Sequence, residues 1–230
     1  MTSTDGSIQA TGNSMPISAM AEDDVPKGMT LWSRTVLSYR DMRAATRDLI
    51  AERPSEARLL FFVLLSDVIF FLSRGVSLVI APGSAAVDVM PPHPGIFVLV
   101  LVMLRTASLY ILSAMITILC RMMGGQGNWR DTRAAVFWAA LAAAPVGVLG
   151  SLVTASFSHL EVFHPIFAEP LIAMPPHYIG VVALLFFLAA GVAEAHRFSR
   201  TSPVFIALSV GTLVAAFGAM VFNKVVLGLG

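Results

Sequence analysis

Five long apolar stretches follow one another after residue 58, and they decide what this chain can fold into. They cover residues 59–80, 96–120, 132–157, 178–196 and 203–227. A helix needs about 20 mostly apolar residues to cross a bilayer. Over the whole chain 57% of the residues are apolar and 13% are charged, whereas a soluble domain carries about 25% charged residues. The sequence therefore predicts an all-α membrane protein with five transmembrane helices.

The positively charged residues between these stretches predict their orientation, because Lys and Arg concentrate in cytoplasmic loops. Seven of them lie between residues 27 and 58, three lie between 121 and 133, and two lie between 197 and 200. The two remaining loops, 81–95 and 158–177, contain none. We therefore expect a cytoplasmic N terminus and a C terminus on the opposite side of the membrane.

The segment before the first apolar stretch divides into two parts. Residues 1–26 are polar and contain few large apolar side chains, which predicts a disordered cytoplasmic tail. In residues 27–57, arginines alternate with apolar residues at helical spacing. This pattern predicts one basic amphipathic helix that lies on a membrane surface rich in anionic lipids. A helix that docks a cytoplasmic partner is a compatible alternative.

A glycine-rich corner, "GGQGNWRD", joins the second and third apolar stretches. Glycine is favoured where a helix ends in a left-handed residue, and tryptophan is favoured at the membrane interface. A phosphate-binding P-loop would instead require a preceding strand and a Lys-Ser or Lys-Thr pair, and the sequence has neither. We therefore predict a tight cytoplasmic corner. Its characteristic residues are Gly124, Gly125, Gly127, Trp129, Arg130 and Arg133.

The residues around this corner resemble those of a known family. The basic segment "RDMRAATRDLIAERPSEARLLFF" precedes the first apolar stretch, and "GGQGNWRDTRAAVFWAALAAAPVGVL" leads from the corner into an alanine-rich third stretch with a proline in its middle. Together they are similar to the Yip family of multi-pass membrane proteins, the Ypt/Rab-interacting-protein-like domain, in its compact bacterial form with five spans. The resemblance covers residues 31–227.

This resemblance implies a non-enzymatic protein of the bacterial inner membrane, so the far side that the charges predict for the C terminus is the periplasm. Eukaryotic members of the family interact with Rab-type GTPases and with one another. The present chain has a short N-terminal tail in place of their long cytoplasmic domain, so we do not expect a Rab-type GTPase as its partner.

Three charged residues within the apolar stretches are candidates for function, because charge is costly inside a bilayer. Asp67 and Arg74 are seven residues apart and share one face of the first predicted span, and Arg105 falls at an intermediate depth in the second. We predict that the three form an ion cluster. Such a cluster could be a structural ion pair, part of an ion or proton pathway, or a contact to another subunit or a lipid.

Small residues repeat every four positions in two of the predicted spans, and such repeats allow helices to approach closely. One repeat consists of Ala143, Gly147 and Ser151 in the third span. The second is the predicted packing or partner face of the fifth span. It consists of Ala207, Gly211, Ala215 and Ala219. The pattern does not distinguish packing within the chain from packing against a partner.

The sequence contains no nucleophile–base pair, nucleotide motif or haem motif, and the spacing of His159 and His164 matches no common zinc pattern. We therefore expect neither an enzyme nor a metal, cofactor or nucleic-acid partner. The favoured function is that of a membrane interaction protein: a scaffold, assembly factor or accessory subunit that binds other membrane proteins or itself. The alternative is a small transporter or channel that uses Asp67, Arg74 and Arg105.

Overall fold

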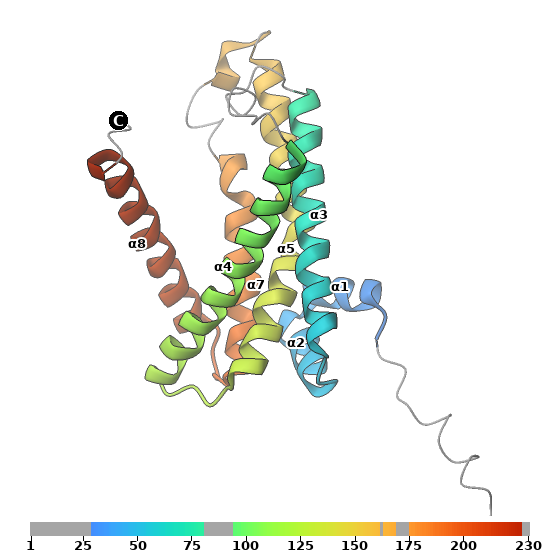
Figure 1. The fold of residues 1–230 in the computed structure, drawn as a ribbon, viewed down its shortest axis with the longest axis vertical. Coiled ribbons are helices and arrows are strands. Elements are labelled where there is room, and N and C mark those ends of the chain that lie inside the picture. Colours follow the sequence, from blue (N-terminus) through green and yellow to red (C-terminus); the bar gives the residue numbers. More distant parts are fainter. Residues whose placement is uncertain (1–28, 81–93, 162, 169–174, 227–230) are drawn as a thin grey trace, which may run out of the picture.

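The computed structural model describes residues 29–80, 94–161, 163–168 and 175–226, and all regular structure in these ranges is helical (Figure 1). The predicted tail of residues 1–26 lies outside them. The elements are α1 (Leu31–Arg40), α2 (Met42–Ala51), α3 (Glu56–Ile80), α4 (Pro94–Met122), α5 (Trp129–Leu160), the 3-10 helix η2 (Pro165–Ala168), α7 (Pro175–Ala195) and α8 (Ser202–Val226). The predicted all-α class is confirmed.

Four of these helices are long and apolar enough to cross a membrane. They are Gly95–Met122, Trp129–Leu160, Tyr178–Ala195 and Ser202–Phe222, and they coincide with the second to fifth predicted spans. Helix α3 covers the first predicted span and runs alongside α5. It is not among the four found in the described residues, so the count of five spans stays a prediction.

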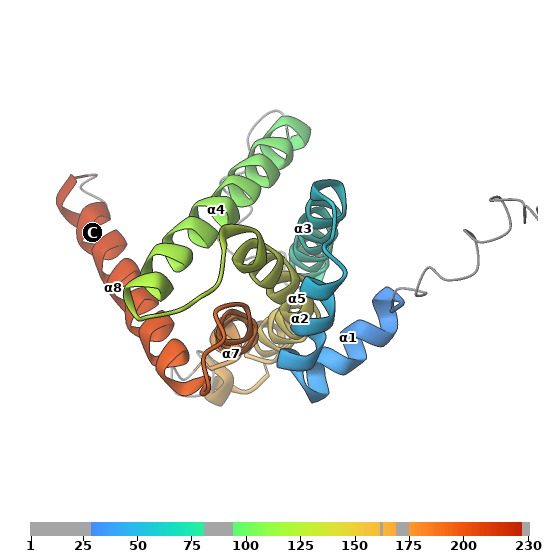
Figure 2. The ribbon, with the colours of Figure 1, turned by 90° about the horizontal axis from the view of Figure 1, so that it is seen from below.

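Helix α5 forms the centre of the bundle, where it packs against α3, α4, α7 and the helix α2 (Figure 2). Ten consecutive residues, 134–143, are all buried. A helix buried on every side must be apolar all round, and the run "AAVFWAALAA" satisfies this condition. Its alanines let neighbouring helices approach, while Phe137 and Trp138 fill the space between them.

The small residues of α5 are used inside the chain. A Cβ atom added to Gly180 of α7 would lie 3.0 Å from the Cα atom of Gly147, so the two helices meet backbone to backbone at this point. One four-residue step further along, the hydroxyl group of Ser151 is hydrogen bonded to that of Ser73 in α3. The repeat of Ala143, Gly147 and Ser151 is therefore an internal packing face.

The prediction of one continuous amphipathic helix over residues 27–57 is wrong. The chain forms two short helices, α1 and α2, which are separated at Asp41 by an extended backbone (φ −149°, ψ 92°). The carboxylate of Asp41 accepts a hydrogen bond of 3.0 Å from the backbone N–H of Ala44. Aspartate at an N-cap stabilises a helix start in this way, so the chain begins a new helix here.

This N-terminal helix pair, α1 and α2, packs against the bundle. The hydroxyl group of Tyr39 donates to the carbonyl oxygen of Ala142 (2.8 Å). The indole N–H of Trp138 donates to the hydroxyl oxygen of Ser38 (2.9 Å). Both bonds reach into the buried run of α5, so the apolar face predicted to lie on a membrane is partly occupied by protein.

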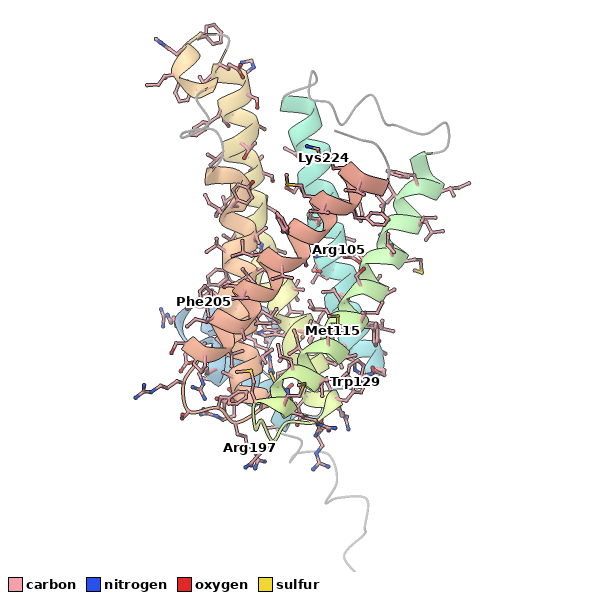
Figure 3. All side chains as sticks on the ribbon, turned by 90° about the vertical axis from the view of Figure 1, so that its left-hand side faces the viewer. Arg105, Met115, Trp129, Arg197, Phe205 and Lys224 are labelled. Atoms are coloured by element: carbon pink, nitrogen blue, oxygen red, sulfur yellow. The ribbon has the colours of Figure 1, made fainter. Side chains whose placement is uncertain are left out.

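Helix α8 diverges from the other helices (Figures 1 and 3). Its first turns pack on the core through Val204, Phe205 and Leu208, whereas every residue from 210 to 222 is exposed. Figure 3 shows Phe205 near the packed end of α8 and Lys224 near the opposite end. The second half of this helix therefore makes no close packing contact with the described part of the chain.

Candidate functional site at the basic end of the helix bundle

Three corners of the chain meet at one end of the bundle, which we call the basic end. They are residues 52–55 between α2 and α3, residues 123–128 between α4 and α5, and residues 196–201 between α7 and α8. The N-terminal helix pair lies at the same end (Figure 1), and Figure 3 shows Trp129 and Arg197 there.

Glu194, in the last turn of α7, fastens α2 to this end. One carboxylate oxygen of Glu194 lies 2.9 Å from Nε of Arg43, and the other lies 2.7 Å from Nε of Arg47. Arg43 also donates to the carbonyl oxygens of Phe198 (2.7 Å) and Ser199 (3.2 Å). Two arginines that the sequence suggested for anionic lipid are therefore engaged by a carboxylate of the same chain.

The other glutamates near the corners are also paired. Glu52 binds both Arg34, which is 1% exposed, and Arg58, whose Nη1 lies 2.8 Å from the carboxylate. Glu56 binds Arg133, whose guanidinium also lies over the ring of Trp129 at 5.5 Å. Of the predicted corner residues, Arg133 thus joins α5 to α3, and it lies over Trp129 within α5.

Three helices end at this site with a left-handed residue: Arg53 after α2 (φ 48°), Gly124 after α4 (φ 86°) and Arg197 after α7 (φ 60°). The backbone N–H of Arg53 donates to Ile50 (3.1 Å), and that of Arg197 donates to Glu194 (3.1 Å). Glycine adopts this conformation without strain, whereas a residue with a side chain loses about 1–2 kcal/mol. Among the described residues, the only non-glycine residues with positive φ are these two arginines.

Glycine is required at two further corner positions because the α4–α5 corner lies against His196. A Cβ atom on Gly125 would lie 2.9 Å from Nδ1 of His196, and one on Gly127 would lie 2.5 Å from the carbonyl oxygen of Ala195. The backbone N–H of Gln126 donates to the carbonyl oxygen of His196 (3.1 Å). The glycine-rich corner is thus a docking point for the α7–α8 corner.

The sequence analysis did not select His196, which is buried at the junction of the two corners. Its Nε2 atom lies 2.8 Å from the hydroxyl oxygen of Thr132. Burial, followed by the positive charge of Arg121, lowers the pKa of His196 below its ordinary value. A neutral histidine therefore joins the two corners at neutral pH. Its position as the last residue of a predicted span, directly before Arg197, was the available signal.

A cavity of about 420 Å³ opens between the α2–α3 corner and the start of α5. Arg130 is fixed at its wall, because its Nη2 atom donates to the carbonyl oxygens of Arg53 (3.0 Å) and Pro54 (3.2 Å). The side chain of Asn128 caps α5 by accepting from the backbone N–H of Asp131 (2.8 Å). The lining residues are Ile50, Ala51, Arg53, Pro54, Asn128, Arg130, Asp131 and Ala134.

Two of the three predicted intramembrane charges meet between α3 and α4. Asp67, which is 1% exposed, forms an ion pair with Arg105, which is 30% exposed. Nη1 of Arg105 also donates to the hydroxyl oxygen of Ser66 (3.0 Å), and the guanidinium lies 5.3 Å from the ring centre of Phe70. The side chain of Arg74 lies outside the described residues, so its place in the cluster stays a prediction.

The predicted packing face of the fifth span lies on the diverging helix α8. Ala207 is half-buried, whereas Gly211, Ala215 and Ala219 are exposed. No atom lies within 4 Å of the position that a Cβ atom on Gly211 would occupy. Unlike the small residues of α5, the second half of this face therefore packs on no other described segment of the chain.

Comparison with known proteins places these features in a family. No curated protein and no solved structure matches the chain. The family model of the Yip1 domain matches residues 36–222, which run from the middle of α1 to the last turns of α8. The match includes all three corners of the basic end and all four helices that are apolar enough to cross a membrane. The resemblance found in the sequence is confirmed, and this integral membrane protein belongs to the Yip1 domain family.

Proposed function

We propose that this chain is a non-enzymatic interaction protein of the bacterial inner membrane. It acts as a scaffold, assembly factor or accessory subunit that binds other membrane proteins or further copies of itself. The observation that best supports this role is helix α8, which leaves the bundle and exposes every residue from 210 to 222. Its partner-binding face consists of Ala207, Gly211, Ala215 and Ala219.

The contrast between two sets of small residues supports this choice. In α5 such residues bring helices into close contact within the chain, at Gly147 and Gly180. In α8 the same spacing occurs on a helix whose second half has no neighbour in the described structure. Lipid tails cover an apolar helix whatever the size of its side chains, whereas small residues favour the close approach of a second helix. A helix from another protein therefore fits the exposed face of α8.

The proposed orientation places the basic end in the cytoplasm and the C terminus in the periplasm. Helix α3 is the first of five spans in this arrangement. The support is the distribution of charge: the N-terminal helix pair and the three corners of the basic end lie at the same end of the bundle (Figure 1). Cytoplasmic loops are enriched in Lys and Arg.

The test is a change of the α8 face that leaves the bundle untouched. Replacing Gly211 and Ala215 with leucine separates any helix that packs there, so the protein should insert and melt normally but no longer self-associate or retain a co-purifying membrane protein. The matched control replaces Val210 and Val214, which are also exposed, with leucine on a neighbouring face. Mass measurement in mild detergent reads out the assembly. A wild-type protein that is a lone monomer without any partner would refute the proposal.

The alternative function, a small transporter or channel, rests on the buried pair of Asp67 and Arg105. Thr106 extends the polar group, since its hydroxyl group lies 3.5 Å from the carboxylate of Asp67. Vesicles that contain the purified protein should show ion or proton movement if this function holds. Asp67→Asn should then abolish the flux in a protein that still inserts.

A further inference from the structure

We propose that the cavity between the α2–α3 corner and the start of α5 binds a phosphate group, carried either by an anionic phospholipid headgroup or by a soluble phosphate ester. The cavity is lined by Arg53 and Arg130. The proposal concerns a site distinct from α8 and does not depend on the proposed interaction function.

The charge around the cavity favours an anion. Arg53, Arg130 and Arg197 all lie close enough to Asp131 to interact with its charge. The cavity itself is lined by two of these arginines and one carboxylate, Arg53, Arg130 and Asp131, which leaves a net charge of plus one, and Arg197 adds positive potential from outside the lining. Asp131 therefore does not neutralise its surroundings, and an anionic ligand would complete the charge balance.

The nearby glutamates form ion pairs with other arginines, so they do not neutralise Arg53, Arg130 or Arg197. Glu52, Glu56 and Glu194 are each paired with other arginines. Within the part of the chain that the structure describes, neither Arg53 nor Arg130 nor Arg197 forms an ion pair with a carboxylate. These three glutamates are therefore occupied by other arginines, and Arg53, Arg130 and Arg197 remain available to bind an anion.

The backbone gives an independent argument. Glycine, as at Gly124, is the residue that a left-handed helix end favours, yet α2 and α7 end in Arg53 and Arg197 (φ 48° and 60°). Non-glycine residues in this conformation cluster at functional sites, and the strain persists only where the surrounding structure imposes it. The two arginines with left-handed backbones are two of the three that surround Asp131. This coincidence points to a use for their side chains.

The lining of the cavity suits a phosphate group that carries an apolar substituent. One nitrogen of Arg130 is held by the carbonyl oxygens of Arg53 and Pro54, which leaves most of its five N–H donors for a ligand. A guanidinium group binds phosphate oxygens in pairs. Ile50, Ala51 and Ala134 add apolar wall, and about 420 Å³ is within the range of small-molecule sites.

The experiment uses the full chain in a non-ionic detergent and three probes: dihexanoyl phosphatidylglycerol, glycerol phosphate and dihexanoylglycerol, which lacks the phosphate. Binding is measured by native mass spectrometry and by the shift in melting temperature. We expect saturable binding of a phosphate probe and none of dihexanoylglycerol. Binding of phosphatidylglycerol alone would identify a lipid headgroup as the source, and comparable binding of glycerol phosphate would identify a soluble ester.

The decisive variants are Arg53→Gly and Arg197→Gly. Arg53→Gly should weaken binding of the phosphate probe by about tenfold, the effect of losing one charge-assisted hydrogen bond, whereas Arg197→Gly, which removes a charge outside the lining, should weaken it less. Neither should lower the melting temperature of the unliganded protein, because glycine accepts the left-handed backbone. Arg53→Lys should restore part of the affinity. Arg40→Gln removes a charge of the same sign from an exposed residue that does not line the cavity, and it should bind as the wild type does.

Three results would overturn the proposal. The first is the absence of saturable binding of either phosphate probe. The second is a loss of affinity in Arg40→Gln equal to that in Arg53→Gly, which would show attraction to the general surface charge. The third is a fall in melting temperature without a change in affinity in the glycine variants, which would show that the two arginines only stabilise helix ends.

Discussion

Removing the carboxylate of Asp67 tests how α3 and α4 are held together. In Asp67→Ala the guanidinium of Arg105 loses its counter-charge while it remains among apolar helices. Breaking a buried ion pair from one side costs about 3–5 kcal/mol. Arg105 keeps its bond to Ser66 (3.0 Å) and is 30% exposed, so part of its charge can be solvated. We therefore expect a loss at or just below the lower end of this range, about 2–3 kcal/mol.

For a chain of this length, 1 kcal/mol corresponds to about 2–4 °C in melting temperature, so Asp67→Ala should lower it by about 5–10 °C. The assay is thermal unfolding of the purified protein in detergent, followed by loss of soluble monomer. Arg105→Ala should cost at least as much, because Asp67 is 1% exposed and cannot find water. The double variant should recover at least half of the loss, since it leaves no unpaired charge at the contact.

Arg74→Ala supplies the control for this cycle, since Arg74 was the other predicted partner of Asp67. Combining it with Asp67→Ala should give no recovery if the pair with Arg105 accounts for the stability. Recovery with Arg74→Ala and none with Arg105→Ala would refute the reasoning. A variant that melts like the wild type but changes the ion permeability of reconstituted vesicles would favour the transporter alternative.

Three further predictions concern the corners and the topology. Gly127→Ala should lower the melting temperature, because its Cβ atom would lie 2.5 Å from the carbonyl oxygen of Ala195 and overpacking costs about 1–3 kcal/mol; Gly211→Ala, with nothing within 4 Å, should not. The lowered pKa of His196 means that the unfolded chain binds its proton at higher pH than the folded chain does. Stability should therefore fall as the pH drops below the ordinary histidine value of 6.5, and a pH profile of melting that is equally steep in His196→Gln would contradict this. Alkaline phosphatase fused after Gly230 should be active and green fluorescent protein dark, and the reverse result would exclude a periplasmic C terminus.

The parts of this structure that could be predicted depend on local composition. Long apolar runs cannot remain in water, so the all-α membrane class followed directly from them. The left-handed backbone of Gly124 could also be predicted from the local sequence, because a helix that ends before a turn favours glycine. The division of the N-terminal segment at Asp41 was missed because periodicity continues across it, although an aspartate three residues before Ala44 is itself a helix-start signal.

The parts that could not be predicted depend on contacts between distant segments. Glu194 is 151 residues from Arg43 in the chain, so no spacing pattern could pair them or show that these arginines face protein. The left-handed backbones of Arg53 and Arg197 run against residue preference, since a prediction would place glycine there. The close approach of Gly125 and Gly127 to His196 is visible only after two corners are brought together. Such departures from local preference are expected where function or strain overrides it.

The two ends of α8 differ in a way that bears on how the protein could act. At its start, the preceding corner is fixed by the hydrogen bonds of Arg43 to Phe198 and Ser199 and by the contact of His196 with the glycine-rich corner. From residue 210 to residue 222 every residue of the helix is exposed. A ligand in the cavity would bind at the basic end, where α8 begins. It would lie near the α7–α8 corner, which sets the direction of α8. Binding at the basic end and partner contact along α8 would then be coupled through one short corner. The coupling can be measured, because affinity for the partner should change with the phosphate probe in the wild type and remain constant in Arg197→Gly.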